Sequence, residues 1–135
     1  MLFFKKHHHK QNLGFTLIEL LITVAIVGIL AQVAYASYAS AIQQSNRYAA
    51  QQSLIEVGQK LERYYSRSGN YASAGVSTGN YDSDNYTFAF SVLTATTYTV
   101  SATPVANSSQ AGDDCGTLTL DYLGAQTATT SGCWK

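Results

Sequence analysis

A single carboxylate, Glu19, lies inside a stretch of sequence that is otherwise suited to lipid. No charged side chain occurs from Leu20 to Asn46. Because a carboxylate is costly in hydrocarbon, an acid at this place predicts a function that brings a compensating positive charge close to it. The simpler alternative is that Glu19 lies at the level of the lipid headgroups without a specific partner. We favour the first interpretation.

Four aspartates offer a second kind of chemistry. Asp113 and Asp114, together with Asp82 and Asp84, could supply the oxygen ligands that calcium prefers. Calcium takes about six to eight such ligands, however, and the sequence has no EF-hand spacing. We therefore interpret these aspartates as part of solvated loops and predict no metal site and no cofactor.

Arginines and tyrosines are mixed between residues 47 and 71. They are Arg47, Arg63, Arg67, Tyr48, Tyr64, Tyr65 and Tyr71. Proteins that bind single-stranded nucleic acid combine such charges with such rings. From residue 15 onward, however, eight acidic side chains face five basic ones, a net charge of −3, whereas nucleic-acid-binding domains are usually basic. We therefore expect the tyrosines to pack beneath a sheet and do not favour DNA as a partner.

The segment that follows Glu19 is suited to a membrane-spanning helix. Its densest apolar part is Leu20–Ala36, and a helix needs about 20 apolar residues to cross the hydrocarbon core. Lys5, Lys6 and Lys10 precede it, which predicts that the N-terminus stays in the cytoplasm.

Two other interpretations of this segment stay open. The basic start, the apolar run and the small residues before Ser37 also fit an ordinary secretory signal. Glu19 argues against it, as does the helical periodicity that continues beyond Ser37. A plain single-pass anchor would fit as well, but it leaves the spacing of Gly14, Phe15 and Glu19 to coincidence.

The run Gly14-Phe15-Thr16-Leu17-Ile18-Glu19-Leu20 resembles the N-terminal signal of type IV prepilins and type II secretion pseudopilins. The resemblance implies cleavage after Gly14 by a prepilin peptidase and N-methylation of Phe15. It implies that Glu19 pairs with the new terminal amine of a neighbouring subunit. It also implies storage in the inner membrane, transfer by an inner-membrane assembly platform, and polymerisation with other pilin subunits into a filament at the cell surface.

One long helix is predicted from near Phe15 to near Arg67. Within it, Ala50, Leu54, Val57, Leu61 and Tyr64 recur at spacings of four and three, which places them on one stripe. Glu56 and Lys60 form a favourable i,i+4 pair on the outer side of the helix. Gly69 is expected to cap its end in the left-handed conformation.

An antiparallel sheet is predicted after a loop over residues 68–85. Alternating apolar and polar residues indicate strands at 86–92, 98–102 and 117–121, with Pro104 ending the second, and a weaker fourth at 126–130. This order resembles the α+β type IV pilin fold, in which a long helix packs against a small antiparallel sheet. The segments 59–72 and 115–121, with Cys133-Trp134, resemble the small minor pilins.

The resemblance divides the chain into three parts. These are a cleaved leader (1–14), a transmembrane and filament-core helix (15–46), and a globular domain that includes the second half of the helix (47–135). Many pilins have a helix-kinking proline where this chain has Ala36, so we expect a straighter helix there.

Cysteine and histidine usage bounds the chemistry of the mature chain. Cys115 and Cys133 are separated by seventeen residues, and an even count in an exported chain predicts one disulfide. Two free thiols would instead fit a cytosolic protein.

All three histidines precede Gly14, at positions 7, 8 and 9, and we interpret them as part of the positively charged leader rather than as a zinc site. A chain cut after Gly14 lacks the histidine of Ser-His-Asp and Cys-His sites, so we predict that it is not an enzyme.

The resemblance favours a structural subunit of a type IV pilus, most similar to a minor pilin, that supports pilus biogenesis and processes such as twitching motility, adhesion or DNA uptake. A type II secretion pseudopilin would share the architecture. An adhesin or DNA receptor at the filament surface is the alternative from a different class, and a basic patch on the folded surface would favour the DNA receptor.

Overall fold

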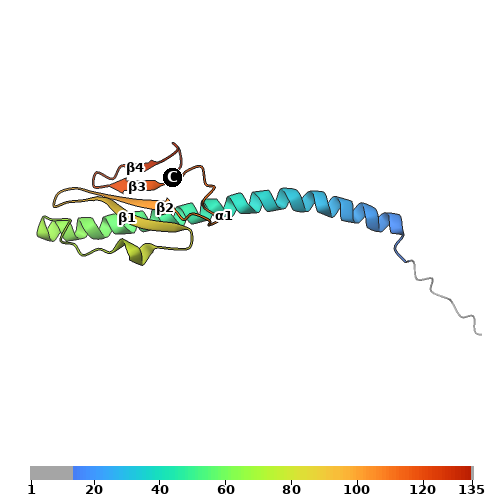
Figure 1. The fold of residues 1–135 in the computed structure, drawn as a ribbon, viewed down its shortest axis with the longest axis horizontal. Helices are drawn as coiled ribbons and strands as arrows, with labels where there is room; N and C mark the ends of the chain where they lie inside the picture. The colour runs from blue at the N-terminus through green and yellow to red at the C-terminus, as the bar shows by residue number, and fades with distance from the viewer. Residues whose placement is uncertain (1–13, 135) are drawn as a thin grey trace, which may run out of the picture. The chain divides into compact units, whose positions relative to one another are not determined.

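The computed structural model describes residues 14–134, so the lysines and histidines of the predicted leader lie outside the described residues. Helix α1 runs from Leu17 to Ser68, in agreement with the predicted helix (Figure 1). The chain divides into two compact units, residues 1–38 and 39–135, and each is described by itself.

The first unit consists, as far as it is described, of the front part of α1 and the three residues before it. Gly14, Phe15 and Thr16 precede the helix in a non-helical conformation. The backbone N–H of Glu19 donates to the Thr16 hydroxyl oxygen at 3.3 Å, so Thr16 is the N-cap of α1.

In the second unit, four strands form an antiparallel sheet in the order β1-β2-β3-β4 (Figure 1). The strands are β1 (Tyr86–Leu93), β2 (Tyr98–Pro104), β3 (Leu118–Asp121) and β4 (Gln126–Ala128). All four lie where the sequence predicts strands, and β4 is shorter than expected. The predicted loop before the sheet contains a short 3-10 helix, η1 (Thr78–Tyr81).

The second half of α1 supplies one side of the core. Ala50, Leu54, Val57 and Leu61 are at most 4% exposed and pack with buried residues of the sheet. Burying such an aliphatic side chain contributes about 1.5–3 kcal/mol, so this stripe holds the helix on the sheet. Tyr64, which the sequence also assigns to the stripe, is only partly buried, and the following tyrosine packs against the core instead.

Glycines shape the helix at two places. Gly69 has a φ of +67°, and its N–H donates to the Tyr65 carbonyl, which confirms the predicted left-handed cap. Gly58 lets the sheet approach the helix, because an added Cβ would lie 3.0 Å from Leu120 Cδ2 and 3.1 Å from the Tyr98 hydroxyl oxygen.

The C-terminal segment is tied to the rest of the domain by the predicted disulfide. Cys115 and Cys133 are bonded, with their Cα atoms 5.7 Å apart. The Gln51 side-chain amide, which is buried on α1, donates to the Cys133 carbonyl at 2.7 Å. Trp134 donates its indole N–H to the Thr127 carbonyl of β4 at 2.7 Å.

Candidate functional site

The front part of α1 exposes an unusually long apolar surface. Every residue from Leu17 to Ser40 is exposed, including Leu17 at 77% and Ile29 at 67%. The helix is long and apolar enough to span a membrane, with a mean hydropathy of 2.4 in its most apolar window and none of that window buried. Apolar patches of this extent mark surfaces that contact protein or lipid.

Glu19 lies in the first turn of this helix and has local contacts only. Its carboxylate accepts a long hydrogen bond, 3.5 Å, from the Thr16 hydroxyl, and within residues 14–134 it forms no ion pair. Thr16 and Glu19 together resemble a capping box, in which the residues at N-cap and N3 support each other. This capping role was not among the expectations for Glu19, although the Thr-x-x-Glu spacing in the sequence indicates it.

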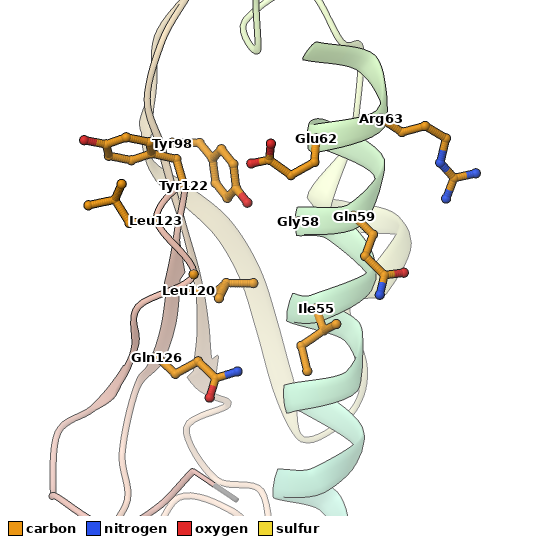
Figure 2. A pocket seen from close by; sticks show the side chains of 11 residues that line it. Ile55, Gly58, Gln59, Glu62, Arg63, Tyr98, Leu120, Tyr122, Leu123 and Gln126 are labelled. Atoms are coloured by element: carbon orange, nitrogen blue, oxygen red, sulfur yellow. The ribbon is translucent and has the colours of Figure 1, made fainter. Parts of the chain in front are cut away.

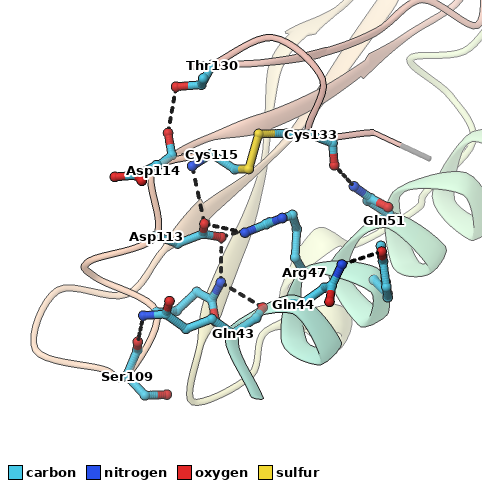
Figure 3. Close-up of polar contacts among 12 residues, drawn as sticks. Gln43, Gln44, Arg47, Gln51, Ser109, Asp113, Asp114, Cys115, Thr130 and Cys133 are labelled. Carbon is cyan, nitrogen blue, oxygen red and sulfur yellow. Dashed lines mark hydrogen bonds and ion pairs between the residues drawn. A yellow bond between two sulfur atoms is a disulfide. The ribbon is translucent and has the colours of Figure 1, made fainter. Parts of the chain in front are cut away.

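Asp113 is buried in an ion pair and does not belong to a solvated loop, so that interpretation of it is wrong. Its carboxylate accepts from Arg47 Nη2 at 2.5 Å and from Arg47 Nε at 3.0 Å (Figure 3). Gln110 Nε2 donates to the same carboxylate at 2.6 Å, and the Cys115 N–H donates at 3.2 Å. The cluster joins α1 to the loop before β3, because Gln110 Nε2 also donates to the Gln43 carbonyl.

Electrostatics keep Asp113 ionised. Burial raises the pKa of Asp113, but the hydrogen bonds from Arg47, Cys115 and Gln110 outweigh it, so the pKa lies below its usual value. The same hydrogen bond raises the pKa of Arg47 despite its partial burial. Burial, followed by the charge of Asp113, raises the pKa of the neighbouring Tyr86 to about 12.

The other three of these aspartates, Asp82, Asp84 and Asp114, are exposed and form no ion pair in the described part of the chain, which agrees with their assignment to solvated loops. Asp82 accepts from the Phe88 N–H at 2.7 Å and so caps the outer edge of β1. In the described part of the chain, no group of three His, Cys, Asp or Glu side chains is arranged to hold a metal ion.

The arginines and tyrosines between residues 47 and 71 separate into a packed set and an exposed set. Tyr71 is 4% exposed, stacks on Tyr65 with ring centroids 4.2 Å apart and meets Tyr98 edge-on, as expected for rings beneath the sheet. A basic face on α1 is exposed instead, and it consists of Lys60, Arg63, Tyr64 and Arg67 around one shallow depression. Lys60 also pairs with Glu56 at 2.9 Å, as predicted.

Comparison with known proteins agrees with this architecture. Residues 36–119, more than half of the chain, match the family described as "Type IV minor pilin ComP, DNA uptake sequence receptor". Residues 9–35 match the prokaryotic N-terminal methylation motif. No curated protein matches the chain.

Two solved structures are similar. A type IV pilin from Shewanella oneidensis is 34% identical over 69% of this chain and 98% of its own, with a TM-score of 0.57. The non-core minor pilin PilV of Neisseria meningitidis shares the fold at 18% identity, with 67% of this chain and 90% of its own covered and a TM-score of 0.55. With its methylation motif, its exposed apolar helix and its disulfide-closed sheet, the chain belongs to the type IV minor pilins and is a pilus subunit.

Proposed function

We propose that the chain enters the pilus through the front part of α1 after cleavage between Gly14 and Phe15 by a prepilin peptidase and methylation of Phe15. The observation that carries this proposal is the exposed apolar surface of α1. Before assembly, residues 15–46 lie in the inner membrane as a single span with a cytoplasmic N-terminus. On the assembly platform, helices of other pilin subunits replace the lipid, and residues 47–135 form the domain at the filament surface.

Glu19 fixes how neighbouring subunits are placed along the filament. Cleavage creates an ammonium group on Phe15, and in the filament core that group has little water. A carboxylate of a neighbouring subunit can neutralise it, and an unpaired charge in such a core would be strongly unfavourable. Because Glu19 is the one acidic residue between Phe15 and Asn46, it is the side chain that can do so.

The test separates the charge of Glu19 from its place in the helix cap. Glu19→Gln keeps a hydrogen-bonding side chain at N3 but removes the charge, whereas Thr16→Val removes the cap and keeps the charge. Both variants should accumulate in the membrane. Immunoblots of sheared pili should show strong loss of the Glu19→Gln subunit and near-normal amounts of Thr16→Val, and mass spectrometry should find methylated Phe15 at the start of the mature chain.

Equal incorporation of Glu19→Gln and the unaltered chain would show that the charge does not drive assembly. A mature protein that begins at Ser37 would overturn the proposed processing.

A second candidate function is DNA binding at the filament surface. The matching family description names a DNA uptake sequence receptor, and the basic face on α1 gathers Lys60, Arg63 and Arg67 beside an aromatic ring. Phosphate contacts make binding salt-dependent, so the double variant Arg63→Gln, Arg67→Gln should lower the affinity for duplex DNA and reduce the slope of log affinity against log salt by about two. Fluorescence anisotropy with the full chain in detergent micelles measures both. Unchanged affinity would remove this candidate.

A further inference from the structure

An open groove separates the second half of α1 from the turn between β3 and β4 (Figure 2). Its volume is about 670 Å³. Ile55, Gly58 and Glu62 line it on the helix side, and Leu120, Tyr122 and Leu123 line it on the sheet side. All residues that line the groove belong to the globular domain, so none of them is part of the assembly surface proposed above.

The sheet side of the groove is held in place by backbone hydrogen bonds. The Asp121 carboxylate accepts from the Leu123 N–H at 2.9 Å and from the Ala125 N–H at 2.8 Å. The Tyr122 N–H donates to the Tyr98 carbonyl at 3.1 Å. A wall fixed in this way loses little conformational freedom when a partner binds.

This fixed turn presents an apolar side chain to solvent. Leu123 is 75% exposed, the highest value for a large apolar side chain in the described part of residues 39–135, and the Tyr122 ring beside it is 40% exposed. Since the hydrogen bonds prevent the turn from folding inward, Leu123 can lose its contact with water only when another molecule covers it.

On the helix side, the groove contains a negative charge. Glu62 points from the helix toward the sheet (Figure 2). The Tyr71 hydroxyl donates to its Oε1 at 2.9 Å. Arg63 also lines the groove, but its guanidinium points away from the sheet in the same view. The two ion pairs among residues 14–134 join other residues, so Glu62 has no cationic partner there.

Two tyrosines lie close to this carboxylate, and neither of them neutralises its charge. Burial, and then the hydrogen bond to Glu62, raise the pKa of Tyr71 to about 12. Burial, and then the charge of Glu62, raise the pKa of Tyr98 as well. Both rings therefore stay neutral, and Glu62 is the charged side chain of the groove that points toward the sheet.

We propose that this groove binds a segment of a partner protein that presents an arginine or lysine side chain next to an aliphatic one. The cationic head pairs with Glu62, where a guanidinium can form charge-assisted hydrogen bonds. Its apolar stem lies along Leu120, and the exposed Tyr122 ring offers a face to the cation. The neighbouring aliphatic residue covers Leu123. The Glu62 carboxylate faces the sheet and disfavours phosphate there, so we expect a cationic side chain rather than DNA as the occupant.

The test uses the full chain, labelled at its leucine methyl groups, in detergent micelles. The probe is the peptide acetyl-Ala-Leu-Arg-Leu-Ala-amide, and the control is the same peptide with glutamate in place of arginine. The arginine peptide should shift the methyl resonances of Leu120 and Leu123 saturably, and the glutamate peptide should not. Equal shifts with both peptides, or none with either, would overturn the proposal.

Matched variants assign the effect to the groove. Glu62→Gln should weaken binding about tenfold, because it removes a charge-assisted contact but keeps an acceptor for Tyr71. Glu56→Gln removes the same charge from the same helix outside the groove and should leave the affinity unchanged. Leu123→Ser should weaken binding while the remaining methyl spectrum shows a folded domain. Equal weakening by Glu56→Gln and Glu62→Gln would show that only overall charge matters. Saturable shifts of the Leu123 methyl resonances with duplex DNA would show that the groove binds nucleic acid and not a peptide.

Discussion

Arg47→Met should destabilise the globular domain by about 3–5 kcal/mol at pH 7, the range found when one partner of a buried ion pair is removed. The side chain of Asp113 is 2% exposed, whereas that of Arg47 is 18% exposed. Without the guanidinium, the carboxylate stays buried with hydrogen bonds from Gln110 and Cys115 but no opposite charge. Methionine fills much of the space of the arginine stem, so the loss of packing is small.

The sign of the pH dependence should reverse in this variant. In the unaltered chain the folded-state pKa of Asp113 is lowered. Its contribution to the free energy of unfolding is therefore present above the unfolded pKa of about 3.9 and is lost as the pH falls through the folded pKa. In Arg47→Met, burial is the largest influence on the carboxylate and only the hydrogen bonds from Cys115 and Gln110 oppose it, so we expect the folded pKa of Asp113 to rise above the unfolded one. The folded state then binds the proton more tightly, so acidification from pH 7 toward pH 5 should restore part of the lost stability.

Urea unfolding of the full chain in detergent micelles, followed by near-ultraviolet circular dichroism at pH 7 and pH 5, measures both effects. The double variant Arg47→Met, Asp113→Asn has no buried charge and should be more stable than Arg47→Met at pH 7, with little change between the two pH values. A loss below about 1 kcal/mol, typical of exposed pairs, together with an unchanged pH slope, would refute the reasoning.

Two further substitutions test the packing of the domain. Cys133→Ser should lower the free energy of unfolding by about 3 kcal/mol and reduce the level of exported protein; the unaltered chain in reductant should match the variant, and a difference smaller than about 1 kcal/mol would contradict a stabilising disulfide. Gly58→Ala should cost about 1 kcal/mol net, because overpacking against Leu120 exceeds the gain in helix propensity. Gly28→Ala is the matched control for the urea midpoint, because an added Cβ there meets no atom within 4 Å. A gain in stability in Gly58→Ala would show that Leu120 can move aside.

The elements of the fold follow from local sequence. Spacings of three and four run through α1, and Gly69 marks its end by a conformation that favours glycine. Alternation in β2, and in β1 as far as Phe90, places every second side chain on the core, for example Tyr86 and Phe88, so strand positions can be predicted without tertiary information. The fourth strand has no large apolar residue, and pairing with β3 determines where it ends.

The polar clusters depend on contacts that local patterns do not contain. Arg47 and Asp113 are 66 residues apart, and their pairing requires the loop before β3 to fold back on α1. Ideal helical spacing does not predict whether Tyr64 or Tyr65 packs against the core. In the structure it is Tyr65, because its ring stacks on that of Tyr71. The groove could not be predicted either, since the exposure of Leu123 follows from the hydrogen-bonded turn that carries it.

We expect the two units of the chain to have different tasks, the front helix in assembly and the globular domain in partner selection. An apolar helix with one carboxylate can pack against any helix of similar composition, so the front part of α1 carries little information about which partner is correct. Specificity requires contacts that stabilise binding of one partner and destabilise binding of another, and charged groups beside apolar surface do both. In the described part of residues 39–135, the basic face and the groove meet at Arg63, and Glu62 gives the groove a carboxylate that the basic face lacks. A neighbour with the wrong charge at either place would leave a desolvated charge unpaired, so we expect these two surfaces, rather than the apolar helix, to determine which molecules the subunit accepts.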